Sequence, residues 1–111
     1  MALAVAFGAF GAHFVRDVLT PERFDIYQTA VQYHFFHSLG LLIVGLAAIH
    51  VHDSPWLLWS GRLLIAGIVI FSGSLYLLVA TQTGWFGAIT PLGGLALIAG
   101  WILLGVAVYK R

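Results

Sequence analysis

The sequence predicts an all-α integral membrane protein, a bundle of four transmembrane helices whose first helix is short or N-terminally truncated. The first observation is composition: 61% of the 111 residues are hydrophobic and only 8% are charged, whereas soluble domains usually carry about 25% charged residues. The second is that the apolar segments are continuous, without the alternation over about ten residues that a membrane barrel requires. The third is a net charge of only +1, which excludes a nucleic-acid binder and leaves the lipid bilayer as the partner.

The first helix is predicted over residues 1–15, which carry no charged residue and whose only ionisable side chain is His13. At about 1.5 Å of rise per residue they reach only about 22 Å, less than the roughly 30 Å of a hydrocarbon core. A cleaved signal peptide would need a basic segment ahead of its apolar stretch, and no basic residue precedes Arg16. We therefore expect a short or clipped first span.

The second span is predicted over residues 31–51, inside a run of 27 uncharged residues that ends at Asp53. An interfacial lead-in over residues 20–30 precedes it and is expected to continue into the same helix. Thr20 and Pro21 are typical of a helix start, as the cap and the first helical residue. The expected end of the span is marked by polar residues and a proline: His50, His52, Asp53, Ser54 and Pro55.

Two further spans are predicted in the 47 residues between Arg62 and Lys110, which include no Asp, Glu, Lys or Arg. One helix of this length would measure about 70 Å, enough for two crossings, so the chain must turn. We expect Thr90 to cap the helix after the turn and Pro91 to occupy its first position. The predicted third and fourth spans are 61–80 and 91–109, and the connections within this single domain, 1–111, are 16–20, 52–60 and 81–90.

Four spans would place both termini on one side of the membrane. The basic residues divide three to two between the sides: Arg62, Lys110 and Arg111 against Arg16 and Arg23. This difference favours cytoplasmic termini. Four aromatic residues fall near predicted interfaces, where amphipathic rings prefer to lie: Trp56, Trp59, Trp85 and Tyr109. Trp101 falls in the middle of a span and is expected to pack between helices.

Glycines are expected to form the contacts between helices. The chain has 13 glycines, and a glycine in a soluble helix costs about 1 kcal/mol relative to alanine. In lipid, helices are held together by close packing, which small residues permit. The expected packing positions are Gly8, Gly11, Gly73, Gly93, Gly94 and Gly100.

Polar residues of the predicted spans fall in one half of the membrane when the four spans are folded antiparallel. This half faces the 16–20 and 81–90 connections. The residues of the predicted cluster are His13, Tyr33, His37, Ser72, Ser74, Tyr76 and Thr90. One interpretation is that they form hydrogen bonds between helices, worth about 0.6 kcal/mol on average. The other is that they bind a ligand, relay protons or hold a metal, as ionisable groups inside membranes often do.

Few residues of the chain could form a metal or haem site. His34 and His37 resemble half of a metal pair that His13 could complete, and His13 with His37 could in principle face each other across a haem. No acid lies in these spans to support either site. His50 and His52 point about 200° apart on a helix, so a solvated edge is their default interpretation. We expect no bound metal and no cofactor.

Four short runs of sequence and three single residues, taken together, resemble a known family. These are Gly8-Ala9-Phe10-Gly11-Ala12-His13; then Thr29, Tyr33 and His37; Phe71-Ser72-Gly73-Ser74-Leu75-Tyr76; Thr90-Pro91-Leu92-Gly93-Gly94; and Gly100-Trp101. Over nearly the whole chain the sequence is similar to the YgdD-type family of small bacterial inner-membrane proteins, a domain of unknown function with a small eukaryotic relative. The resemblance implies four spans and brings no established activity, cofactor or substrate. Members usually begin about ten residues earlier, which would lengthen the first span. His34 and Arg62 depart from the family pattern.

The sequence offers no catalytic set, so we do not expect an enzyme. There is no cysteine, and every acid lies in a connection or in the lead-in. The leading hypothesis is a non-enzymatic accessory, scaffold or packing protein, acting alone, as a homo-oligomer or beside a larger membrane complex. The alternative is a small transporter, channel or ligand-binding protein that uses the polar cluster in the extracytoplasmic leaflet.

Overall fold

The computed structural model describes residues 1–111 and consists of helices without strands. The elements in chain order are α1 (Ala2–Phe10), its π-helical continuation η1 (Gly11–Val15), α2 (Pro21–Ala47), α3 (Pro55–Thr81) and α4 (Phe86–Tyr109). By length and composition α2, α3 and α4 could each cross a membrane, whereas α1 with η1 is shorter. The predicted all-α membrane class with a short first helix is therefore confirmed.

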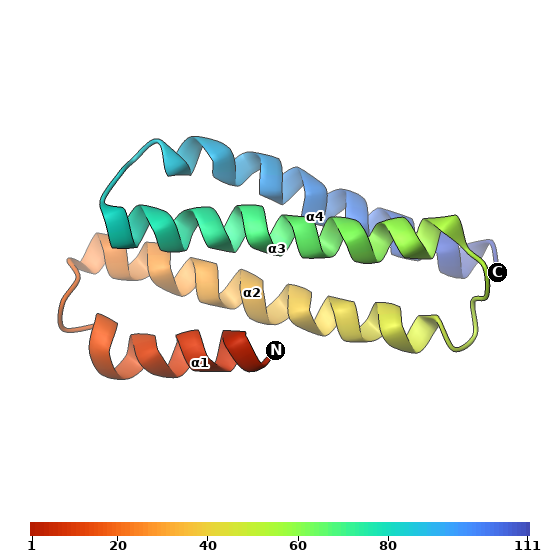
Figure 1. Ribbon diagram of the computed structural model, residues 1–111, viewed down its shortest axis with the longest axis horizontal. Helices are drawn as coiled ribbons and strands as arrows, with labels where there is room; N and C mark the ends of the chain where they lie inside the picture. Colours follow the sequence, from red (N-terminus) through yellow and green to blue (C-terminus); the bar gives the residue numbers. More distant parts are fainter.

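The helices lie side by side in the order of the chain, as a layer rather than a four-cornered bundle (Figure 1). The layer measures 48 × 26 × 15 Å along its principal axes. The α1–α2 and α3–α4 connections lie at one end, and the α2–α3 connection and the C-terminus lie at the other (Figure 1). The N-terminus lies partway along α2, so the expectation that both termini reach one end holds only for the C-terminus.

The second helix begins where the Thr-Pro pair predicts. The Thr20 side chain accepts a hydrogen bond from the Arg23 backbone N–H at 3.4 Å, and Pro21 occupies the first helical turn. Proline is suited to this position because its missing N–H would have no helical partner there. The lead-in and the span form one continuous helix of 27 residues, which is about 40 Å long.

The third helix begins earlier than the sequence analysis placed it. Ser54 caps it by accepting a hydrogen bond from the Leu57 N–H at 3.3 Å, and Pro55 follows in the first turn. The expectation that this Ser-Pro pair ends the previous span, with a connection over 52–60, was wrong. The same chemistry that starts α2 starts α3, and it brings Trp56, Trp59 and Ser60 into the helix.

The fourth helix also begins earlier, so Thr90 is not its cap and Pro91 is not its first residue. The chain turns at residues 83–85 and the helix starts at Phe86, with Pro91 inside it. Pro91 has no N–H, so the Gly87 carbonyl one turn earlier lacks its usual helical donor. The Thr90 hydroxyl donates to the neighbouring Phe86 carbonyl at 3.3 Å, and the helix continues through the proline.

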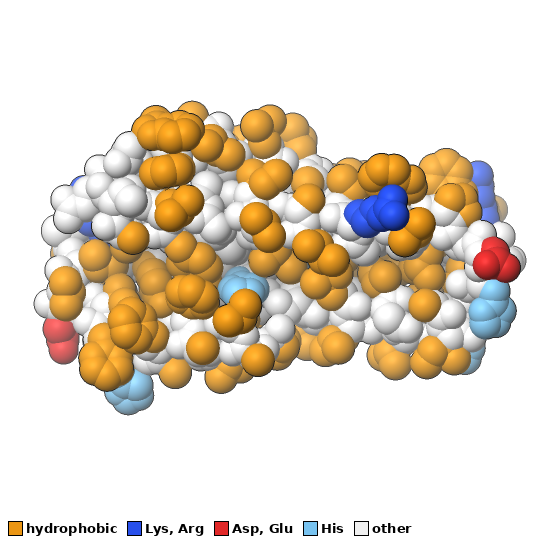
Figure 2. All heavy atoms as spheres, in the orientation of Figure 1, with side chains coloured by type: hydrophobic (Ala, Val, Ile, Leu, Met, Phe, Trp, Pro, Cys, Tyr) orange, Lys and Arg blue, Asp and Glu red, His pale blue; other side chains and the backbone are white.

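Charged side chains gather mostly toward the two ends of the layer, and hydrophobic side chains cover the surface between them (Figure 2). At the end that holds the C-terminus, the Arg62 guanidinium lies 5.2 Å from the centre of the Trp59 ring, and the Lys110 ammonium lies 5.1 Å from the Trp56 ring. Cations and amphipathic rings both prefer the membrane interface. This arrangement matches the predicted aromatic belt at that end.

Candidate functional site

The structure divides the predicted polar cluster into separate groups, the first of which connects α1 to α2 and α3. The Tyr27 hydroxyl donates a hydrogen bond to the Phe7 carbonyl, and the Tyr76 ring stacks on the Phe7 ring with centroids 4.6 Å apart. The Tyr76 hydroxyl and His34 Nδ1 share a hydrogen bond of 3.3 Å. An aromatic group from three helices thus fixes the position of the short first helix.

The second group surrounds His37, which is buried on α2. His37 Nδ1 donates a hydrogen bond to the Tyr33 carbonyl one turn earlier, at 2.7 Å. The Tyr33 ring stacks on Phe71 with centroids 4.1 Å apart, and the His37 ring meets Trp101 edge-on at 6.2 Å. The Nδ1 hydrogen bond is available to a neutral imidazole, so His37 can be satisfied here without a ligand. Trp101 packs against α2 as expected for a mid-span residue.

The third group consists of Ser72 and Ser74 on α3, whose hydroxyls contact the neighbouring helices. Ser72 on α3 donates to the Ala30 carbonyl of α2 at 2.8 Å. Ser74 donates to the Phe71 carbonyl at 2.9 Å, and its hydroxyl lies 2.7 Å from that of Thr90 on α4. The Ser72 bond and the Ser74–Thr90 contact join different helices, as hydroxyl side chains typically do in membranes, whereas the bond to Phe71 lies within α3.

His13 does not join any of these groups. It lies exposed on η1 and its side chain forms no hydrogen bond. The expectation of one continuous cluster placed residues by depth along the helix axis, and depth does not specify which face of a helix a residue occupies. Because His13 and His37 make no shared contact, the geometry gives no support to a proton path, a metal site or a haem built on both. No group of three or more His, Asp or Glu side chains lies close enough together to hold a metal ion.

Glycines mark the closest approaches of the helices, at some of the expected positions and at others that were missed. A Cβ atom at Gly11 would overlap the Tyr27 ring, one at Gly93 would overlap the Phe71 backbone, and one at Gly100 would lie 2.9 Å from Leu64. Gly8 and Gly94 have room for a Cβ at ordinary contact distance, and Gly73 has no neighbour within 4 Å. The glycines missed by the sequence analysis are Gly40, against Trp101, and Gly67, against Leu97.

Further polar contacts were also missed. Ser60 is fully buried and donates to the Gly100 carbonyl at 2.7 Å, directly beside the close approach of Gly100 to α3. Ser60 falls inside the connection predicted over 52–60, which α3 replaces. Tyr27 and His34 are seven residues apart and so share one face of α2, which is the signal that could have found them. Arg23 precedes Tyr27 by four residues, and its Nη1 atom is buried without a hydrogen-bond partner.

Comparison with known sequences identifies the family. The model of the family described as "Protein of unknown function (DUF423)" matches residues 7–94. The chain belongs to this family. It is 46% identical over 108 residues to the UPF0382 membrane protein YwdK of Bacillus subtilis, covering 97% of this chain and 88% of that protein. UPF0382 membrane proteins of Staphylococcus epidermidis and Staphylococcus haemolyticus are 46% and 43% identical over 112 residues, covering 97% of this chain and 87% of each relative.

No solved structure matches the chain. The DUF423 relatives are named as membrane proteins, in agreement with the apolar helices of this chain. The segment matched by the DUF423 family runs from Phe7 on α1 to Gly94 on α4. It includes the residues of the three groups described above except Trp101, which the His37 ring meets from α4.

Proposed function

We propose that this protein is a non-enzymatic accessory or scaffold protein of the plasma (inner) membrane, which packs against a second copy or a larger membrane complex. The observation that carries the proposal is the flat arrangement of the helices. Only 21 of 111 residues are buried, and the accessible surface is 6885 Å². A soluble monomer of 12.0 kDa would expose about 6,000 Å². A layer 15 Å thick thus leaves both wide faces open to lipid or to another helix.

The polar groups of α3 support a structural role over a chemical one. The hydroxyls of Ser60, Ser72 and Ser74 all donate to backbone carbonyls inside the chain. A hydroxyl already engaged in this way is not arranged as a nucleophile with an adjacent base. Such bonds stabilise the layer and leave packing against other membrane components as its function.

The outer face of α4 is the surface we expect a partner to cover. Several large apolar residues of this helix are exposed: Leu92, Leu95, Ile98 and Ile102. Gly105 lies exposed on the same helix, and a Cβ atom added there would meet nothing within 4 Å. In membranes an open glycine on a helix surface permits a second helix to approach closely.

The orientation is part of the proposal. The C-terminal end of the layer carries three basic residues, Arg62, Lys110 and Arg111. The opposite end carries two, Arg16 and Arg23. Because basic residues are enriched in cytoplasmic segments, we place the C-terminal end in the cytoplasm. Cysteine accessibility at Lys110→Cys and at Thr83→Cys, which lie at opposite ends, measures this orientation in intact cells.

The experiment that tests the proposal is purification in mild detergent, followed by native mass spectrometry of the protein in nanodiscs. We expect a dimer or a stable complex with another membrane protein. Gly105→Phe should dissociate it, since the bulky ring would hold a second helix away from α4. Gly45→Phe is the matched control, because Gly45 on α2 also has no neighbour within 4 Å. A wild-type protein that is strictly monomeric and free of partners contradicts the scaffold role.

A further inference from the structure

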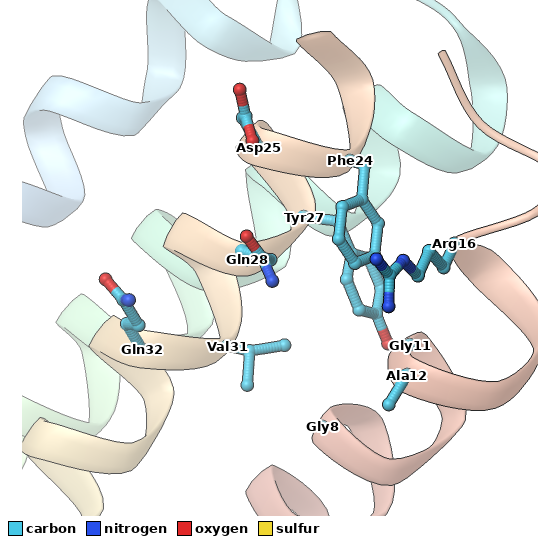
Figure 3. A pocket seen from close by; sticks show the side chains of 10 residues that line it. All are labelled: Gly8, Gly11, Ala12, Arg16, Phe24, Asp25, Tyr27, Gln28, Val31 and Gln32. Carbon is cyan, nitrogen blue, oxygen red and sulfur yellow. The ribbon is translucent and has the colours of Figure 1, made fainter. Parts of the chain in front are cut away.

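A cleft of about 530 Å³ lies between two walls (Figure 3). One wall is formed by the end of α1 and by η1, and the other by the first three turns of α2. This volume lies within the range of about 300–1,000 Å³ that is typical of small-molecule sites. On one side the cleft is bounded by Gly8 and Gly11, which carry no side chain, and on the other by Val31. It is separate from the polar groups that connect the helices, except that Tyr27 borders both.

The cleft collects polar side chains that have no partner in the chain. Asp25, Gln28 and Gln32 lie along one face of α2, at spacings of three and four residues. Arg16 extends from the opposite wall to lie beside Phe24 and Tyr27, and the Gln28 amide is directed toward the same space, whereas the Asp25 carboxylate points outward at the rim (Figure 3). Neither the Arg16 guanidinium nor the Asp25 carboxylate forms an ion pair or hydrogen bond within the protein. The two glutamine amides likewise form no side-chain hydrogen bond.

Depth in the membrane makes these unpartnered groups costly. The 27-residue helix α2 is about 40 Å long, so when centred it extends about 5 Å beyond each side of the hydrocarbon. Gln28 and Gln32 lie about 10 and about 16 Å from the start of α2, and hence about 5 and about 11 Å inside the hydrocarbon. Acyl chains cannot hydrogen-bond to a carboxamide, which is expensive to leave unsatisfied in lipid. A polar occupant near the membrane surface would satisfy Gln28, the shallower of the two amides.

We propose that the cleft between α1 and α2 binds the headgroup of a zwitterionic aminophospholipid, of the phosphatidylethanolamine type. The phosphate would accept hydrogen bonds from the Arg16 guanidinium, and the primary ammonium would donate to the Asp25 carboxylate and the Gln28 amide oxygen. Arginine matches a phosphate through its planar set of donors. The glycerol end and the acyl chains would leave the cleft along Val31, toward the bilayer core.

The charges at this end of the layer favour a zwitterion over an anionic lipid. Two basic residues and three acidic residues lie between positions 16 and 25, a net charge of −1: Arg16, Asp17, Glu22, Arg23 and Asp25. An anionic headgroup would add a second net negative charge there, whereas a zwitterion adds none. A choline headgroup has no N–H to donate to Asp25, so it would satisfy only the Arg16 side of the cleft.

The test uses the full chain in nanodiscs that contain equal parts of phosphatidylethanolamine, phosphatidylcholine and phosphatidylglycerol. Native mass spectrometry counts the lipids that remain bound after the protein is released. We expect phosphatidylethanolamine to be retained about tenfold over phosphatidylcholine, the preference that one charge-assisted hydrogen bond provides. Successive N-methylation of the headgroup should reduce retention stepwise. Equal retention of the three lipids, or preference for phosphatidylglycerol, overturns the proposal.

Substitutions of single residues test whether the preference for phosphatidylethanolamine arises in the cleft. Asp25→Asn should remove the preference for ethanolamine over choline, and Arg16→Gln should reduce retention of both. Glu22→Gln and Arg111→Gln are the matched controls, because both residues are exposed and neither borders the cleft. If Glu22→Gln abolishes the preference as completely as Asp25→Asn does, the cleft is not the site. Competition by soluble glycerophosphoethanolamine at equal concentration would show a free-headgroup site and would overturn the lipid assignment.

Discussion

The contact between α3 and α4 at Gly93 gives the sharpest test of how the helices are held together. A Cβ atom at Gly93 would lie 2.8 Å from the Phe71 Cα and closer still to the Phe71 nitrogen. Backbone atoms cannot rotate away as the end of a side chain can, so Gly93→Ala must push the two helices apart. Gly94 is the matched control: its Cβ would lie 3.8 Å from the Phe71 ring, at ordinary contact distance.

The magnitude follows from comparing the two neighbouring substitutions. Both replace glycine by alanine inside the same helix, so both gain about the same helix propensity, about 1 kcal/mol. Only Gly93→Ala also carries the cost of overpacking, about 1–3 kcal/mol. The free energy of unfolding should therefore be lower for Gly93→Ala than for Gly94→Ala by about 1–3 kcal/mol, because the propensity gain cancels in the difference.

The assay is reversible unfolding in mixed micelles by increasing fractions of a denaturing detergent, followed by tryptophan fluorescence. Trp101 lies on α4 and packs against His37 and Gly40 of α2, so its fluorescence should change when α4 leaves the layer. Helicity measured by circular dichroism in the native micelle would show that both variants are folded. If the two variants unfold at the same detergent fraction, the reasoning that backbone contact at Gly93 sets the α3–α4 distance is refuted.

Three further outcomes follow from single contacts. Tyr27→Phe removes the hydrogen bond to the Phe7 carbonyl, so amide exchange of α1 should accelerate while that of α4 does not; unchanged exchange in α1 would contradict an anchoring role. Ser72→Ala removes the bond to the Ala30 carbonyl and should lower the free energy of unfolding by about 0.6 kcal/mol and by at most about 1.7 kcal/mol. Leu64 is fully buried, so Leu64→Ala should cost about 2–5 kcal/mol in the same detergent assay, and a loss below that of Ser72→Ala would count against a packed interface there.

The number and class of the helices were predictable because they depend on where charges are absent. Charge-free runs between Asp25 and Asp53 and between Arg62 and Lys110 are dictated by the cost of charge in hydrocarbon. Helix starts were less predictable. The pairs Thr20-Pro21 and Ser54-Pro55 each begin a helix, whereas the chemically similar Thr90-Pro91 lies inside one. Which of these occurs depends on the contacts that the preceding residues make, which local sequence does not specify.

The sequence predicts the height of each polar residue along its helix axis, but not the face of the helix on which the residue lies. Tyr33, His37, Ser74 and Thr90 do lie within contacts between helices, since a span fixes the height of each residue along its axis. The face that a residue presents depends on how the helix is rotated against its neighbours, and each residue turns by about 100°. This is why His13 was grouped with residues that it does not contact.

The polar residues of this protein separate into those that the fold uses and those that it does not. On α3, the Ser60 hydroxyl bonds to the Gly100 carbonyl across the contact with α4, and the Ser72 hydroxyl bonds to the Ala30 carbonyl of α2. Between α1 and α2, Tyr27 closes one side of the contact, and beyond it the helices leave a cleft rather than a packed seam. A structural role explains the first set completely. It does not explain why Gln28 should face a cleft inside the membrane, since an apolar residue there would pack better in lipid. A headgroup site explains the Gln28 amide and the opposite charges of Arg16 and Asp25 at the cleft, and it would tether a scaffold protein to a defined lipid.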